Sequence, residues 1–256
     1  MRDLRVTLVQ QPLAWHDAAA NRAHFESLLA PHAGTTDLVV LPEMFTTGFT
    51  MSAAEIAETM DGPSVAWLRA TARRLRAVVT GSVVVDDDGY RNRLLWATPD
   101  GELAWYDKRH LFRMAREHEH YAAGETRRVL EVGGWRVLPL VCYDLRFPVW
   151  SRNRGDYDLA LYVANWPAAR RHPWCTLLRA RAIEHLCYVV GVNRVGADGV
   201  GIEYAGDSAA IDPLGQPVVD CGAAAAVTTV TLSGDVLEAH RARFPAHLDA
   251  DDFRLA

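Results

Sequence analysis

The sequence lacks an excess of basic residues, a long hydrophobic run and any closely paired cysteines, and each absence removes a class of protein. Its 27 Lys and Arg residues against 32 Asp and Glu residues give a formal net charge of −5, without the basic surplus typical of proteins that bind nucleic acids or anionic membranes. The longest stretch without a formal charge, 221–234, has 14 residues, too few to cross a bilayer. We therefore predict no nucleic-acid partner and no membrane partner.

The four cysteines, at positions 142, 175, 187 and 221, have no C-x-x-C spacing of the kind used in zinc and redox sites. Near the N-terminus the only apolar run is 6–9, too short for the apolar region of a secretory signal. We predict a cytoplasmic protein with reduced thiols. Each cysteine is then either a small packing residue or a nucleophile.

What the sequence does contain is an ordinary globular composition, with 50% hydrophobic and 23% charged residues. This excludes a largely disordered chain. A length of 256 residues fits one or two domains, and there is no Pro/Ser-rich linker and no fixed-period repeat. We predict one domain over residues 1–256.

Apolar runs that alternate with amphipathic segments predict an α/β fold. We expect strands at 5–10, 37–42, 78–85, 91–97, 103–108, 135–142, 157–165, 188–193, 208–212, 217–221 and 225–232. We expect helices at 18–31, at 64–75 with Ser64 as the N-cap, and at 173–186. Turn residues at 86–89 and 99–101 indicate antiparallel hairpins within a mixed sheet that helices cover.

Three of these apolar runs end in reactive side chains, namely Glu43, Lys108 and Cys142. Strand ends in α/β folds commonly handle ligands. A thiol attacks as its thiolate and needs a proton acceptor and a nearby cation. Between an ordinary thiol and an ordinary carboxylate the transfer costs about 6 kcal/mol, so Glu43 can act as the base only in an environment that shifts both pKa values. For any one of these residues alone, an ordinary structural position is the favoured interpretation.

Three ordered segments, 41–45 (LPEMF), 106–112 (YDKRHLF) and 140–148 (LVCYDLRFP), resemble the signatures of the nitrilase superfamily of carbon–nitrogen hydrolases. The resemblance extends over nearly the whole chain. The segments 107–114, 117–118 and 163–167 are similar to the bacterial omega-amidase branch of that superfamily. The resemblance implies a nitrilase-like α-β-β-α sandwich, with mixed sheets covered by helices, and a homodimer.

The resemblance also implies a role for each reactive residue. Glu43 is the general base, Lys108 the cation that stabilises the oxyanion, and Cys142 the nucleophile, while the backbone N–H of Tyr143 is a second oxyanion donor. A second glutamate follows the lysine in this family, and Glu117 and Glu119 both fall in that loop. We favour Glu117 from its distance to Gly124. No metal and no organic cofactor is implied.

The implied reaction is hydrolysis of the terminal amide of a small 2-oxo acid amide, such as 2-oxoglutaramate or 2-oxosuccinamate, through a thioester on the cysteine. Another amidase of the superfamily, of the deaminated-glutathione or N-carbamoyl type, is the alternative within the family. A binding protein that keeps the fold without turnover is the alternative from a different class.

The resemblance also implies that the loops beside these segments line the substrate pocket. Its expected residues are Phe45, Phe49, Arg146, Asn165 and Trp166. For Phe45, Phe49 and Trp166, packing in the core is an equally open alternative. For a substrate carboxylate, the sequence leaves Arg113, Arg146 and Arg194 open as partners.

Several side chains also have structural or competing interpretations. We expect a salt bridge between Asp144 and Arg146, and packing roles for the other three cysteines. His118 and His120 lack zinc-type spacing. A cysteine–histidine pair would need a histidine such as His110, His172 or His185 beside the thiol.

Overall fold

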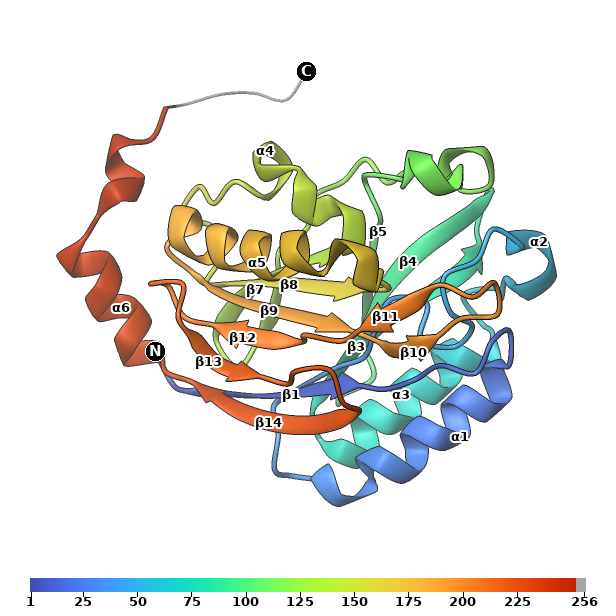
Figure 1. The fold of residues 1–256 in the computed structure, drawn as a ribbon. Coiled ribbons are helices and arrows are strands. Elements are labelled where there is room, and N and C mark those ends of the chain that lie inside the picture. Colours follow the sequence, from blue (N-terminus) through green and yellow to red (C-terminus); the bar gives the residue numbers. More distant parts are fainter. Residues whose placement is uncertain (252–256) are drawn as a thin grey trace.

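The computed structural model describes residues 1–251 of the chain, and it contains two six-stranded mixed sheets, in agreement with the mixed sheets expected. The first sheet has the order β14-β1-β2-β3-β4-β5 and the second β13-β12-β9-β8-β7-β6. Each sheet is mixed, because three neighbouring strands run parallel and hairpins extend them. The α/β class and the α-β-β-α sandwich are confirmed, and Figure 1 shows helices outside each sheet.

The strands of the first sheet are β1 (Leu4–Gln10), β2 (Leu38–Val40), β3 (Val78–Asp86), β4 (Tyr90–Ala97), β5 (Leu103–Asp107) and β14 (Ala226–Leu232). Those of the second are β6 (Leu130–Val132), β7 (Trp135–Val141), β8 (Leu159–Ala164), β9 (Tyr188–Asn193), β12 (Ala209–Ile211) and β13 (Pro217–Asp220). A small hairpin joins β10 (Val195–Ala197) to β11 (Glu203–Ala205). Every expected strand is present, whereas β6, β10 and β11 were not predicted.

The α-helices are α1 (Ala18–Leu29), α2 (Ala53–Ile56), α3 (Pro63–Leu75), α4 (Pro148–Ser151), α5 (Arg171–His185) and α6 (Gly234–Arg243). Short 3-10 helices are η1 (Ala30–His32), η2 (Arg113–Ala115), η3 (Glu117–Glu119), η4 (Cys142–Arg146), η5 (Ala168–Arg170) and η6 (Ala246–Asp249). The three expected helices correspond to α1, α3 and α5. Within residues 1–251, no helix is long and apolar enough to span a membrane.

The start of α3 corrects one expectation. Ser64 is not the N-cap, because the helix begins at Pro63 with Gly62 as the capping residue. Proline is favoured in the first helical turn, where its missing N–H has no partner to lose. The Ser64 hydroxyl instead donates to Glu58 Oε1 at 2.6 Å, so the serine ties the helix start to the segment before it.

The core has a layer on each side of the first sheet. Alternate residues of β1, including Leu4, Val6 and Leu8, pack between the two sheets. Val9 of β1 and Val39 of β2 face the opposite way, toward α1 and α3. This alternation is the ordinary consequence of strand geometry. The parallel strands β2 and β7 belong to different sheets of the sandwich. Glu43 follows the carboxyl end of β2, and Cys142 follows that of β7.

Candidate active site

Cys142 lies in a sharp turn between β7 and η4. Its φ of 46° is in the left-handed region, which costs energy for a residue with a side chain and persists only where the surroundings hold it. Asp144 holds this turn, because its Oδ2 accepts from the Val141 N–H at 3.0 Å and from the Tyr106 hydroxyl at 2.8 Å. The turn therefore fixes the thiol at the carboxyl end of a buried strand.

Asp144 is not paired with Arg146, so the expected salt bridge is wrong. Its other oxygen, Oδ1, accepts from the backbone N–H of His110 and contacts His110 Nδ1 at 2.7 Å. Arg146 extends elsewhere, with its guanidinium carbon 5.0 Å from the centre of the Trp166 ring. Asp144 and Arg146 are close in the sequence, but after the left-handed turn at Cys142 their side chains contact different residues.

Glu43 follows β2 and has no solvent-exposed surface. Its Oε1 accepts from Asn92 Nδ2 at 2.8 Å and from Lys108 Nζ at 2.9 Å, and its Oε2 accepts from the Asn165 N–H at 2.8 Å. These donors come from β4, from the end of β5 and from the end of β8. Both sheets therefore contribute to the position of this one carboxylate.

Lys108 is buried between two carboxylates. Its Nζ donates to Glu43 at 2.9 Å and to both oxygens of Glu117 at 3.0 Å. Burial by itself lowers the pKa of Lys108, but the charges of Glu117 and Glu43 outweigh it and hold the pKa above the usual lysine range. The ammonium is therefore a permanent cation.

Glu117 and Glu119, which the sequence left in competition, have different surroundings. Glu117 is fully buried and accepts from Lys108 and from the backbone N–H of Phe112. Glu119 is exposed and its Oε2 accepts from Arg116 Nη2 at 2.6 Å. Burial raises the pKa of Glu117, against the lowering effect of Lys108. The structure thus brings Glu117, and not Glu119, to the lysine.

The partners of the two buried carboxylates indicate their ionisation state. Glu43 and Glu117 each receive hydrogen bonds on both oxygens, and Lys108, Asn92 and backbone N–H groups donate them. These partners are donors and offer no acceptor for a carboxyl proton. Both groups therefore fit the site as carboxylates, and the buried charges of the two acids and the lysine sum to one negative charge.

The Cys142 thiol lies against this charged cluster. Burial raises the pKa of Cys142 well above its usual value, and Glu43 raises it further through its charge and a side-chain hydrogen bond, while Lys108 lowers it. The Sγ atom is also 4.0 Å from the Asn165 carbonyl oxygen. The resting sulfur is therefore a neutral thiol that has a carboxylate, Glu43, as its nearby proton acceptor.

A cavity of about 40 Å³ opens onto this thiol. It is lined by Phe49, Lys108, Phe112, Cys142, Tyr143, Arg146, Asn165, Trp166, Pro167 and Arg170. Four of the five expected pocket residues line it. The expectation for Phe45 is wrong, because that ring is fully buried and packs on Phe25 and Trp67 beneath the first sheet. Phe112 and Arg170 were not predicted, since neither adjoins the strand ends in the sequence.

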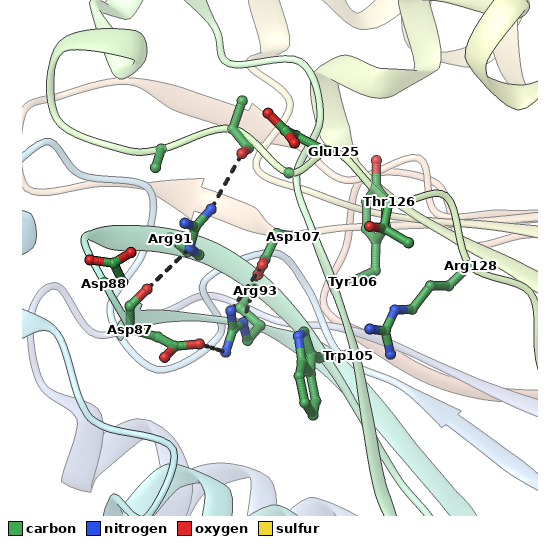
Figure 2. A pocket seen from close by; sticks show the side chains of 13 residues that line it. Asp87, Asp88, Arg91, Arg93, Trp105, Tyr106, Asp107, Glu125, Thr126 and Arg128 are labelled. Atoms are coloured by element: carbon green, nitrogen blue, oxygen red, sulfur yellow. Dashed lines mark hydrogen bonds and ion pairs between the residues drawn. The ribbon is translucent and has the colours of Figure 1, made fainter. Parts of the chain in front are cut away.

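A larger open pocket of about 580 Å³ lies outside β4 and β5 and does not include the thiol. Figure 2 shows Arg93 directed toward Asp87 and Asp107, and Arg91 directed toward backbone oxygens. Arg93 and Asp107 are cross-strand partners in the first sheet. Arg93 is thus paired with two carboxylates of this pocket, and one of them, Asp107, is the last residue of β5 before Lys108.

The three histidines that could have served the thiol lie elsewhere, and His172 is an exposed residue of α5 beside Thr176. His110 bonds to Asp144 and stacks on Phe147 with ring centres 3.8 Å apart. His185 lies beside Ser151, and burial together with nearby arginines lowers its pKa to about 3. None of the charged groups that act on the Cys142 thiol is a histidine. The arrangement does not favour a cysteine–histidine pair.

Two other arginines that the sequence left open for a carboxylate lie outside the cavity. Arg113 is exposed, and Arg194 is buried over the Tyr204 ring with backbone carbonyls as its acceptors. The remaining cysteines pack in or against the core, with Cys187 fully buried. Arg146 is thus the only one of the three arginines that reaches the thiol's cavity.

Comparison with known proteins gives the family. The carbon-nitrogen hydrolase model matches residues 5–242. The chain belongs to the carbon-nitrogen hydrolase family. This hydrolase is 55% identical to "Omega-amidase YafV" of Yersinia enterocolitica, with all of both chains covered. It is 33% identical to the "2-oxoglutaramate amidase" of Bacillus subtilis, covering 85% of this chain and 86% of the relative.

A solved structure agrees with this membership. A CN-hydrolase superfamily protein from Xanthomonas campestris, described with an arsenic adduct in its active site, is 58% identical to this hydrolase. The two chains cover each other completely and superpose with a TM-score of 0.99. The resemblance to the nitrilase superfamily that the sequence motifs indicated is therefore confirmed.

Proposed function

We propose that this carbon-nitrogen hydrolase is an omega-amidase, which releases ammonia from the terminal amide of a small 2-oxo acid. The observation that carries the proposal is the buried cluster of Glu43, Lys108 and Glu117 against the Cys142 thiol. A neutral thiol, an ionised acceptor and a fixed cation are the groups that amide cleavage through a thioester needs.

In the first step, Glu43 takes the proton of the Cys142 thiol as the sulfur attacks the amide carbonyl carbon. A carbon–sulfur bond forms, and the carbonyl π electrons move to oxygen. The raised pKa of the thiol makes this transfer unfavourable before substrate binds, so it is coupled to attack. The thiol therefore loses its proton only as the carbon–sulfur bond forms.

The developing oxyanion needs donors that are already in place. Lys108 supplies a permanent charge at the cavity wall. The N–H of Tyr143 is in the first turn of η4, where backbone donors have no partner within the helix. We assign these two groups to the oxyanion, and we assign Glu117 to holding the lysine in place.

Collapse of the tetrahedral intermediate breaks the carbon–nitrogen bond. Protonated Glu43 gives its proton to the departing nitrogen, so ammonia leaves and a thioester remains on Cys142. Glu43, again a carboxylate, takes a proton from water as the water oxygen attacks the thioester. The tetrahedral intermediate expels the sulfur, which recovers a proton from Glu43, and the free acid is released.

The substrate assignment rests on the relatives' names and on one arginine. Relatives across the whole chain are named omega-amidase, and another is named 2-oxoglutaramate amidase. Arg146 lines the cavity beside Cys142 and has no ion-pair partner within residues 1–251. A carboxylate at the other end of the amide substrate would form an ion pair with the Arg146 guanidinium.

The test is an ammonia-release panel with 2-oxoglutaramate, 2-oxosuccinamate, glutamine, a simple nitrile and an N-carbamoyl amino acid. We expect the two 2-oxo acid amides to have the highest kcat/KM, and Cys142→Ser to lower it at least about a thousandfold with the melting temperature retained. Preference for any of the other three compounds, or turnover by Cys142→Ser, would overturn the proposal.

We also propose that the hydrolase is a homodimer joined through α4 and α5. Val149 of α4 and Ile183 of α5 are each 52% exposed, and Leu214 near Ile183 is 62% exposed. Val149 shares a surface pocket with Glu184, the residue after Ile183, and Gly215, the residue after Leu214, lies against Ile183. Exposed apolar side chains that lie together are typical of a subunit contact.

A further inference from the structure

Arg170 is a second unpaired guanidinium at the mouth of the thiol's cavity. It ends η5, at the junction with α5, and its guanidinium carbon lies 5.2 Å from the centre of the Phe112 ring. Its side chain makes a weak polar contact, in which Nη1 donates to the Met114 sulfur at 3.8 Å. Phe112 and Arg170 both line the cavity. A guanidinium stacked on a ring face keeps its in-plane N–H donors available.

The neighbouring arginine, Arg171, has an acidic partner. Arg171 makes two bonds to Asp207, at 2.6 and 2.7 Å. Arg170, one position earlier, forms no ion pair within residues 1–251 and neither does Arg146. Two half-buried cations without counter-ions therefore face one small cavity, and both rest on aromatic walls, Phe112 and Trp166.

The charged side chains that line the cavity are all cations, namely Lys108, Arg146 and Arg170. Lys108 already has two carboxylate partners, Glu43 and Glu117, which are not among the lining residues. The two arginines are therefore the charges on the cavity wall that remain for an anionic ligand.

The size of the cavity indicates what moves. About 40 Å³ accommodates only a few water molecules, not a five-carbon amide. Lys108 and Asn165 are fixed by hydrogen bonds to Glu43, whereas Arg170 is held by a ring and a sulfur alone. The arginine side chains can therefore turn from their aromatic walls toward a ligand at little cost.

We propose that Arg170 is a specificity-determining residue, which binds the substrate carboxylate together with Arg146 and disfavours an amide that carries an α-ammonium group. This inference rests on the proposed amidase function. Two cations that line one small cavity attract a carboxylate and repel an ammonium, so the free 2-oxo acid amide is accepted in preference to the corresponding amino acid amide.

The test compares amides that differ in one group. Pentanamide has no charge, glutaramate has a carboxylate in place of its terminal methyl group, and glutamine adds an α-ammonium. For Arg170→Gln, we expect the ratio of kcat/KM for glutaramate to kcat/KM for pentanamide to fall about tenfold to a hundredfold, mainly through KM, as for loss of one charge-assisted hydrogen bond. Arg170→Lys should recover part of the ratio.

The same variant should narrow the preference for glutaramate over glutamine, because less positive charge then faces the ammonium. Arg69→Gln is the matched control, since Arg69 is exposed on α3 and forms no ion pair with the described part of the chain, residues 1–251; its ratios should match those of the unmodified enzyme. An unchanged glutaramate-to-pentanamide ratio in Arg170→Gln overturns the assignment. Failure of the unmodified enzyme to hydrolyse any amide would instead reject the proposed function.

Discussion

At the scale of single residues, burial distinguishes Glu117 from Glu119 as the second glutamate of the site. Glu117→Gln removes one of the two charges that hold Lys108, and we expect kcat/KM to fall at least about a hundredfold. Glu119→Gln breaks an exposed pair with Arg116 and should change kcat/KM less than about twofold. Both variants are measured by ammonia release, and equal losses would move the role away from Glu117.

The shifted pKa values of the site predict an unusual pH profile. Glu117 must be ionised to hold Lys108, and burial raises its pKa above 4.5, so activity should be lost as the pH falls through a midpoint higher than that. Lys108 and Cys142 both have raised pKa values, so neither should lose its proton below about pH 9. We expect one ascending limb and then a plateau in kcat/KM. A descending limb between about pH 7 and 9 would contradict this description of the thiol and the lysine.

At the scale of elements, the loop that carries Glu117 is fastened to the end of β5 at Gly124. The Gly124 N–H donates to the Lys108 carbonyl at 2.9 Å, and a Cβ at this position would lie 2.1 Å from the Asp107 carbonyl oxygen. Gly124→Ala must therefore move backbone beside the lysine. We expect at least a tenfold loss of kcat/KM, with a cost of about 1–3 kcal/mol in the free energy of unfolding.

Gly134→Ala is the control for that substitution. Gly134 has a left-handed φ of 82°, unlike Gly124, so an alanine strains the backbone there, but apart from its chain neighbours no atom of residues 1–251 lies within 4 Å of the added Cβ. This variant should lose stability and keep its activity per folded molecule, as measured by denaturant unfolding and ammonia release. If Gly124→Ala also keeps its activity per folded molecule, the contact of Gly124 with the end of β5 does not position the site.

Elements also show how far sequence reasoning reaches. The apolar runs that end at Glu43, Lys108 and Cys142 could be predicted, because buried strands have a strong local pattern. The strands β10 and β11 have three residues each and one buried side chain apiece, Val195 and Tyr204, so they lack the apolar run that marks the equally short β2.

Phe112 and Arg170 come from loops that meet only in the folded chain. Phe45 follows Met44, whose φ of 42° is left-handed, and packs in the α1–α3 layer.

At the scale of the whole molecule, the proposed dimer gives the next prediction. Ile183→Glu places a charge on the exposed face of α5, and we expect sedimentation to show a monomer where the unmodified protein is a dimer. Ile202→Glu is the control, because Ile202 is also exposed, at 43%, but precedes β11. A dimer that survives Ile183→Glu, or a monomeric unmodified protein, would reject this contact. The cytoplasmic location and the single domain over 1–256 stay predictions.

The pairing of β1 with β14 has a consequence for how the protein is made. These strands are hydrogen-bonded along their whole length, from Leu4 with Leu232 to Gln10 with Ala226, and they lie side by side in Figure 1. Contacts of such large sequence separation form late and slow folding. During synthesis, β1 therefore remains an open sheet edge until residues 226–232 have left the ribosome. Over that interval the nascent chain exposes a strand that can pair with other chains, so β14, translated more than 200 residues after β1, also protects it.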